Sequence, residues 1–203
     1  MKRVFVALGL VVLVGFVTPA FAQSNEWTID TAHSATIFTA RHLLVSNVRG
    51  QLGPVKGTVK YDGKDIKSIE ADVVIDVTQL NTRIEARDKH LRSADFFDAE
   101  NHPTMTFKSK RAEPAGEGRF TLIGDLTIRG NTHEVALDCE WPSPPLKSRD
   151  TLRIGASATT KISRKAFELL WNNLIETGGA IVGDEIQVQI DLEVVQKLTP
   201  PAQ

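Results

Sequence analysis

The sequence predicts an all-β domain of eight antiparallel strands, and two observations carry that prediction. Apolar and polar residues alternate along many short segments, which places alternate side chains on opposite faces of a strand. Only two segments, residues 82–92 and 164–171, have a helical pattern, and both are too short to cover the faces of a large parallel sheet. A closed barrel and a two-sheet sandwich both fit this pattern, and periodicity alone does not separate them.

The N-terminal segment, residues 1–22, has the pattern of a secretory signal peptide. Lys2 and Arg3 precede an uncharged apolar run at residues 4–17, and a small-residue motif ends at Ala22. This run is shorter than the about 20 apolar residues that a membrane-spanning helix requires. We therefore expect cleavage after Ala22, export to the periplasm and a single domain over residues 23–203.

The strands follow in order along that domain. The last is the clearest, because Ile186, Val188 and Ile190 alternate with polar residues and so give one apolar face and one face in water. Turn-forming pairs such as Asp62-Gly63 separate several of the segments. The eight predicted strands lie near residues 34–40, 55–61, 69–77, 104–110, 120–128, 135–139, 151–162 and 186–194. Eight strands can close on themselves around an interior that side chains or a small ligand would fill.

Composition and motif spacing argue against several functional classes. The chain has 24 Lys plus Arg against 25 Asp plus Glu, so no basic field favours nucleic acid as a partner. Cys139 is the single cysteine and therefore has no partner in this chain for a disulfide or a thiolate metal site. The five histidines lack an HExxH-like spacing, and no GxSxG motif is present, so we expect neither a metal site nor a serine hydrolase.

Several motifs resemble those of the YceI-like family, which comprises periplasmic lipid-binding proteins with a lipocalin-like barrel. The matching motifs are Trp27-Thr-Ile-Asp30, His33-Ser34, Val48-Arg-Gly50, Arg87-Asp88-Lys-His90-Leu91, Asp95-Phe96-Phe97-Asp98, His102-Pro103, Gly124-Asp-Leu126, Ile162-Ser-Arg164 and Gly183-Asp184-Glu185-Ile186. The resemblance extends from about Trp27 to Val195. It implies an eight-stranded lipocalin-like β-barrel with an elongated apolar cavity, which favours the barrel over the sandwich. One departure is Glu168, which stands where the family usually has a glycine.

Candidate ligand-binding residues come from the apolar faces of the predicted strands. We expect eight of them to line the cavity: Phe38, Val59, Ile75, Phe107, Leu122, Leu126, Ile154 and Val188. Phe96 and Phe97, which lie beside two acidic residues, are expected to plug one end of the cavity, with at least one ring buried.

Three polar residues of the segment 82–92 are further candidates. Asp88 and His90 are two positions apart, so they do not share a helix face and are a poor catalytic dyad. We expect them either to fix this segment against the barrel or to line the mouth of the cavity. Arg87 has two interpretations, a contact with a phosphate or carbonyl head group and an ion pair that orders the connection.

The sequence therefore predicts a periplasmic, non-catalytic protein that carries or stores an isoprenoid lipid such as a prenyl quinone or a polyprenyl phosphate. At about 0.8 kcal/mol per buried CH₂, a tail of about forty carbons has a gross transfer term near 30 kcal/mol, which is more than binding requires. No cofactor other than the lipid is expected. We further expect transient contact with the membrane, and the protein to be a monomer or a homodimer. Two alternatives remain: an enzyme acting on a lipid head group, and a stress-related structural or interaction protein with a filled core.

Overall fold

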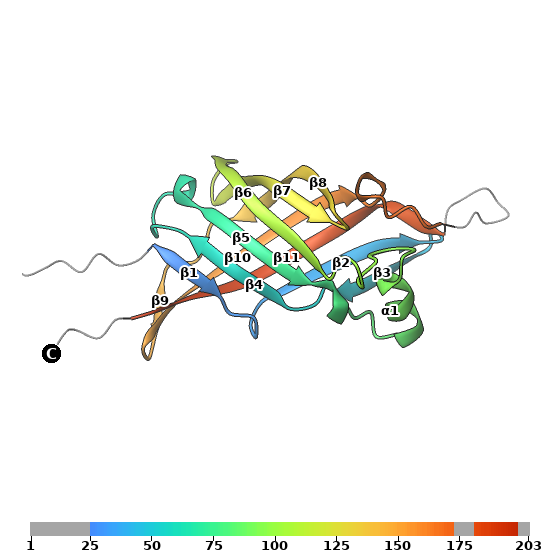
Figure 1. The fold of residues 1–203 in the computed structure, drawn as a ribbon. Helices are drawn as coiled ribbons and strands as arrows, with labels where there is room; N and C mark the ends of the chain where they lie inside the picture. Colours follow the sequence, from blue (N-terminus) through green and yellow to red (C-terminus); the bar gives the residue numbers. More distant parts are fainter. Residues whose placement is uncertain (1–24, 173–180, 199–203) are drawn as a thin grey trace, which may run out of the picture.

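The barrel is the architecture that the structure adopts. The computed structural model describes residues 25–172 and 181–198, so the predicted signal peptide lies outside the described residues. Within that part, all strands belong to one antiparallel sheet that closes on itself as an eight-stranded barrel (Figure 1). The closure excludes the sandwich. Among the described residues, no helix is long and apolar enough to cross a bilayer.

The elements follow one another with short connections. The strands are β1 (Glu26–Ile29), β2 (Ala35–His42), β3 (Ser46–Gln51), β4 (Val55–Lys60), β5 (Glu70–Asp76), β6 (Thr104–Pro114), β7 (Arg119–Ile128), β8 (Asn131–Glu140), β9 (Leu146–Ser148), β10 (Thr151–Ser163) and β11 (Val182–Lys197). The α-helix is α1 (Glu85–Arg92), and three 3₁₀ turns are η1 (Ile66–Ser68), η2 (Val77–Gln79) and η3 (Lys165–Phe167).

Eleven strand segments make eight barrel strands because two strands are interrupted. β1 and β2 pair with successive parts of β11, and β4 and β3 pair with β1 and β2 in turn. β1 and β2 therefore form one interrupted barrel strand, and β3 and β4 form another. β9 is a short strand beside the start of β10. The sequence analysis missed β1, β3 and β9, since β1 and β9 are very short and β3, with the sequence SNVRGQ, has no apolar alternation.

Both helical segments are shorter than the sequence predicted. α1 begins at Glu85 rather than at residue 82, because residues 82–84 form a turn in which Arg83 has a φ of 68°. The segment 164–171 contains only the 3₁₀ turn η3, which ends at Glu168 with a φ of 59°. A left-handed backbone favours glycine, which agrees with the glycine that the resemblance to the YceI-like family implies for this position.

The seams of the barrel differ in their hydrogen bonding. Between β10 and β11 the register runs without interruption from Thr151↔Lys197 to Ser163↔Glu185. Between β8 and β10, only Ala158↔Cys139 and Thr159↔Asp138 are paired among the described residues. Beyond them the contacts pass through side chains, such as the Thr160 hydroxyl that donates to the Ala136 carbonyl at 2.8 Å. The β8–β10 seam is therefore the least hydrogen-bonded part of the wall.

Candidate ligand cavity

An apolar cavity occupies the lumen of the barrel. It has a volume of about 220 Å³, and its surface comes from apolar atoms. All eight residues that the sequence predicted as lining do line it: Phe38, Val59, Ile75, Phe107, Leu122, Leu126, Ile154 and Val188. Their contact with a ligand stays a prediction.

The inward side chains of β11 show that the lumen is not filled by the protein itself. Ile186, Val188, Ile190 and Leu192 all line the cavity, yet each remains only half-buried, whereas Val194 is 4% exposed. At about 24 cal/mol per Å³, an apolar cavity of this volume costs roughly 5 kcal/mol when it is empty. A filled core, as the structural alternative requires, does not match this arrangement.

An aromatic cluster closes one end of the cavity. The His90 ring lies edge-on to Phe96 and Trp171, with ring centroids 5.1 Å and 4.8 Å away, and Phe96 and Trp171 are 5.3 Å apart. Phe96 is 6% exposed, which confirms the expected burial of one ring, and both Phe96 and Phe97 line the cavity. His90 lies 2.9 Å from Asp95 through its Nε2 and is not among the lining residues. His90 thus supports the aromatic closure from outside.

Arg87 and Asp88 are placed beside the barrel wall rather than in the lumen. The carboxylate of Asp88 accepts hydrogen bonds from the N–H and the hydroxyl of Thr82, and Arg87 donates to the hydroxyl oxygen and the carbonyl of the same residue. Neither side chain lines the cavity. The arrangement favours a role in fixing the segment, and the ion pair expected for Arg87 was wrong, since within the described residues Arg87 binds Thr82 instead of a carboxylate.

Arg164 is a site residue that sequence reasoning missed. Arg164 is 4% exposed, and its guanidinium donates to the carbonyls of Leu169, Trp171 (2.9 Å), Val182 (3.3 Å) and Gly183 (3.1 Å). Desolvation lowers the pKa of this arginine from its usual value. The side chain holds the loop after η3 against the start of β11 and so shapes the same end of the cavity. The sequence shows the motif that contains Arg164, but it does not show which backbone carbonyls this side chain binds.

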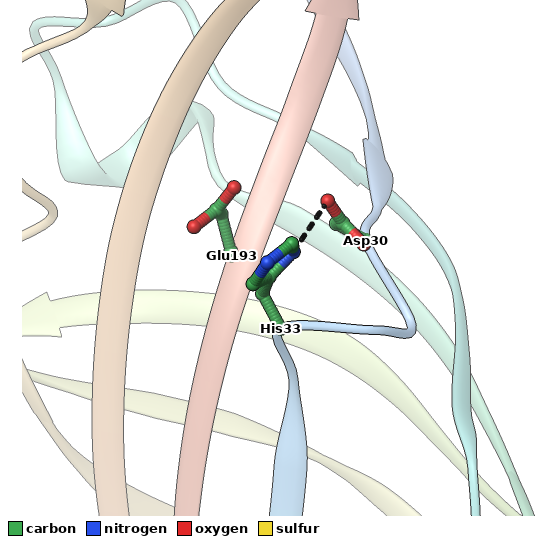
Figure 2. Close-up of side chains that lie close together, drawn as sticks. All are labelled: Asp30, His33 and Glu193. Carbon is green, nitrogen blue, oxygen red and sulfur yellow. Dashed lines mark hydrogen bonds and ion pairs between the residues drawn. The ribbon is translucent and has the colours of Figure 1, made fainter.

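Three residues with metal-binding side chains meet outside the lumen. The ligand atoms of Asp30, His33 and Glu193 lie within 4.8 Å of one another, and His33 Nδ1 is 3.0 Å from Asp30 Oδ2 (Figure 2). The guanidinium of Arg153 contacts both carboxylates, at 3.1 Å for Asp30. A metal ion would have to displace this cation, so we assign the cluster to an ion-pair network that joins β10, β11 and the end of β1. Sequence spacing could not reveal it, because Asp30 and Glu193 are far apart in the chain.

Comparisons with known proteins agree with this architecture. The profile of the YceI-like domain matches residues 27–194. A UPF0312 protein of Vibrio cholerae is 31% identical over 199 residues, which cover 97% of this chain and 100% of that protein. The crystal structure of the YCEI protein of Campylobacter jejuni aligns with a TM-score of 0.65 and 31% identity, covering 77% of this chain and 89% of that one. A polyisoprenoid binding domain from Saccharophagus degradans, implicated in plant cell wall breakdown, aligns with a TM-score of 0.62 at 16% identity, covering 87% and 100%.

Proposed function

Since the chain belongs to the YceI-like family, we propose that it is a non-catalytic periplasmic protein that carries or stores an isoprenoid lipid in its barrel. The observation that carries the proposal is the lumen, whose surface is apolar and whose volume is left unfilled by side chains. A long, flexible hydrocarbon tail complements such a surface along its whole length, whereas a polar solute would lose its hydration without compensation.

The shape of the cavity and one structural neighbour support an isoprenoid as the class of lipid. Its lining includes residues of β11 from Val182 to Val194, which at about 3.3 Å per residue corresponds to a path of roughly 40 Å along the strand. A prenyl quinone or a polyprenyl phosphate has a tail suited to such a path. The polyisoprenoid binding domain of Saccharophagus degradans has the same fold, which supports this class of ligand. The predicted signal peptide supports the periplasm as the compartment.

The polar residues near the lumen support binding rather than turnover. Among the described residues, no histidine lines the cavity. Ser157 is among the lining residues, but its hydroxyl donates to the carboxylate of Asp191 at 3.1 Å, and Asp191 does not line the cavity. An enzyme acting on a lipid head group would need such a pair in contact with the ligand.

Native mass spectrometry followed by solvent extraction tests the proposal. Protein purified from the periplasm of its host should carry a lipid of several hundred daltons in about equimolar amount, because the lumen is otherwise poorly packed. Protein with no bound lipid that also fails to take up a prenyl quinone in vitro would contradict the carrier function. A chemically altered lipid, recovered after incubation with the protein, would favour the enzyme.

A matched pair of variants separates the lumen from the outer surface. Ala158 lines the cavity and Thr159 faces outward, next to it on β10. Ala158→Phe should fill part of the lumen and lower lipid uptake about tenfold or more, while Thr159→Phe should leave uptake unchanged. Circular dichroism would establish that both variants are folded. Equal uptake by both would show that the lipid does not occupy the lumen.

A further inference from the structure

One end of the barrel carries most of the exposed large apolar side chains. Leu44, Val45, Ile84 and Leu170 are 67%, 78%, 52% and 62% exposed, and the other two in the described residues are Trp141 and Leu146. Leu44 and Val45 form the tip between β2 and β3, Ile84 immediately precedes α1, and Leu170 follows η3. Isolated exposed apolar residues are ordinary, but a group at one end of a molecule indicates an interaction surface.

Hydrogen bonds and ring contacts tie most of these segments to the same end. The N–H of Leu43 donates to the carbonyl of Ile181 at 2.8 Å, and Asn172 donates to the carbonyl of Val182 at 2.9 Å. Trp171 in turn packs on His90 of α1 with a centroid distance of 4.8 Å. Figure 1 shows α1 and the β2–β3 tip at one end of the barrel, with β9 toward the opposite end.

This end is also where the aromatic closure of the cavity lies. Phe96, Leu169 and Val182 line the lumen and belong to the segments just described. The exposed apolar residues therefore surround the cavity end rather than a remote face of the barrel.

The tip holds Leu44 exposed in an unusual backbone conformation. Leu43 and Leu44 have φ values of 52° and 59°, a region that bulky side chains rarely adopt. The guanidinium of Arg41 supports the turn by donating to the Leu44 carbonyl at 3.0 Å and to the Asn47 side chain at 3.1 Å. The chain thus maintains a strained turn that leaves Leu44 and Val45 in water.

Four cations without a carboxylate partner among the described residues lie at this end. Arg41, Arg83, Lys89 and Lys165 are exposed, and none of them forms an ion pair with a described carboxylate. Many cations elsewhere on the barrel are paired, such as Lys60 with Glu70 and Arg119 with Asp138. Exposed carboxylates lie at this end too, at Glu85 and Glu168 on the same segments and at Asp95 and Asp184 beside them, so the four cations stand among acidic side chains. Apolar side chains beside cations are typical of proteins that bind the surface of anionic membranes.

We propose that this end of the barrel, defined by Leu44, Val45, Ile84 and Leu170 with the cations Arg41, Arg83, Lys89 and Lys165, docks on a lipid bilayer that contains anionic phospholipids. The inference rests on the proposed function, because docking places the cavity end against the membrane from which a lipid cargo would come. The apolar side chains insert among the acyl chains near the head groups, and the cations contact the phosphates. Once the aromatic closure at this end is displaced, the cargo tail enters the lumen without crossing open water.

Vesicle flotation with the mature protein tests the docking surface. The wild type should float with vesicles of phosphatidylethanolamine and phosphatidylglycerol and bind phosphatidylcholine vesicles several-fold less. The double variant Leu44→Ser/Val45→Ser should lower the bound fraction roughly tenfold, since it removes two apolar side chains from the bilayer. Leu146→Ser is the matched control, because Leu146 is 68% exposed and lies on β9. Equal losses in both variants, or a wild type that stays with the soluble fraction, would overturn the proposal.

Two further measurements distinguish the alternatives. Arg83→Gln/Lys89→Gln should weaken binding to the anionic vesicles several-fold and leave binding to phosphatidylcholine unchanged. Sedimentation velocity would reveal whether the tip instead joins two copies of this chain: a dimer that Leu44→Ser/Val45→Ser dissociates, with vesicle binding intact, would contradict membrane docking. Uptake of a prenyl quinone from a detergent dispersion should be equal in all variants. If the wild type also fails to take up the quinone, the proposed function is contradicted. If the wild type takes up the quinone but does not float with vesicles, only the docking surface is contradicted.

Discussion

The carboxylate of Asp88 accepts two hydrogen bonds from Thr82, from its N–H at 2.8 Å and from its hydroxyl at 2.5 Å. Both residues are buried, at 7% and 4% exposed. Because Arg87 also binds Thr82, one short network fixes the turn that leads from the barrel into α1. The position of α1, and with it the aromatic closure of the cavity, depends on this pair.

Asp88→Asn should lower the free energy of unfolding by about 2 kcal/mol. The neutral amide oxygen accepts hydrogen bonds less strongly than the carboxylate, and the amide also places N–H donors in a buried position. Urea denaturation followed by circular dichroism would measure this. Glu85→Gln, an exposed change on the same helix, should stay within about 0.5 kcal/mol of the wild type. Equal stability of Asp88→Asn and the wild type would show that the turn does not depend on the carboxylate.

Glu168→Gly should raise the free energy of unfolding by roughly 0.5 kcal/mol. A side chain in the left-handed region costs about 1 to 2 kcal/mol, and part of the relief is offset by the greater freedom of glycine in the unfolded chain. Lys165→Gly, within the 3₁₀ turn, is the control and should destabilise. Thermal unfolding of the three proteins gives the order directly, and a Glu168→Gly protein less stable than the wild type would contradict the assignment of strain.

Val188→Asp should cost several kcal/mol in stability or abolish lipid uptake, because it places an unpaired carboxylate on the apolar lumen. Gln187→Asp, which faces outward opposite Lys161 on β10, should be nearly silent. Denaturation curves and a fluorescence displacement assay with a prenyl quinone would compare them. Similar behaviour of the two variants would mean that the inward and outward faces of β11 are assigned incorrectly.

The network around Asp30 predicts a dependence of stability on pH. The hydrogen bond from His33 lowers the pKa of Asp30 below its usual value of 3.8, with smaller contributions in the same direction from the Ala32 N–H and Arg153, while desolvation opposes them. A depressed folded-state pKa stabilises the fold above the unfolded pKa, and this contribution is lost as the pH falls through the folded pKa. Asp30→Asn should therefore be less stable than the wild type at pH 7 by about 1 kcal/mol, and the difference should shrink below about pH 3.8.

Urea unfolding of both proteins across that pH range measures this difference. A constant difference down to strongly acidic pH would contradict the ionic origin of the effect.

Cys139 offers a chemical probe of the lumen. The thiol lines the cavity, and burial raises the pKa of Cys139 from 9.0 to about 11. At pH 8 the folded protein should therefore react with a water-soluble maleimide far more slowly than the unfolded protein in guanidinium, since the thiolate is the reactive form. A bound prenyl quinone should slow the reaction further. Rapid labelling of the folded protein, unaffected by lipid, would place the thiol outside the cavity.

The apolar lining could be predicted from the sequence because the alternation of apolar and polar residues within each strand distinguishes its inward face from its outward face. On β11 the alternation of Val188 and Gln187 directly encodes inside and outside. The interruptions between β1 and β2 and between β3 and β4 could not be predicted, since pairing with distant strands defines them. The roles of Arg164 and Asp30 were hidden for the same reason, because their partners are backbone carbonyls or side chains of segments far along the chain.

The short hydrogen-bonded ladder between β8 and β10 makes this seam the part of the barrel wall that opens most easily. Only two register pairs join β10 to β8, whereas a complete ladder joins β10 to β11. Separating β10 from β8 therefore breaks fewer backbone hydrogen bonds than separating β10 from β11. Local opening free energies vary within a folded protein, so among residues 132–137 the amide protons that are not bonded to β7 should exchange with solvent before the amide protons of residues 186–194. If this seam opens first, the girth of the barrel would change there while the rest of the wall keeps its register, and the proposed lipid cargo could then vary in thickness.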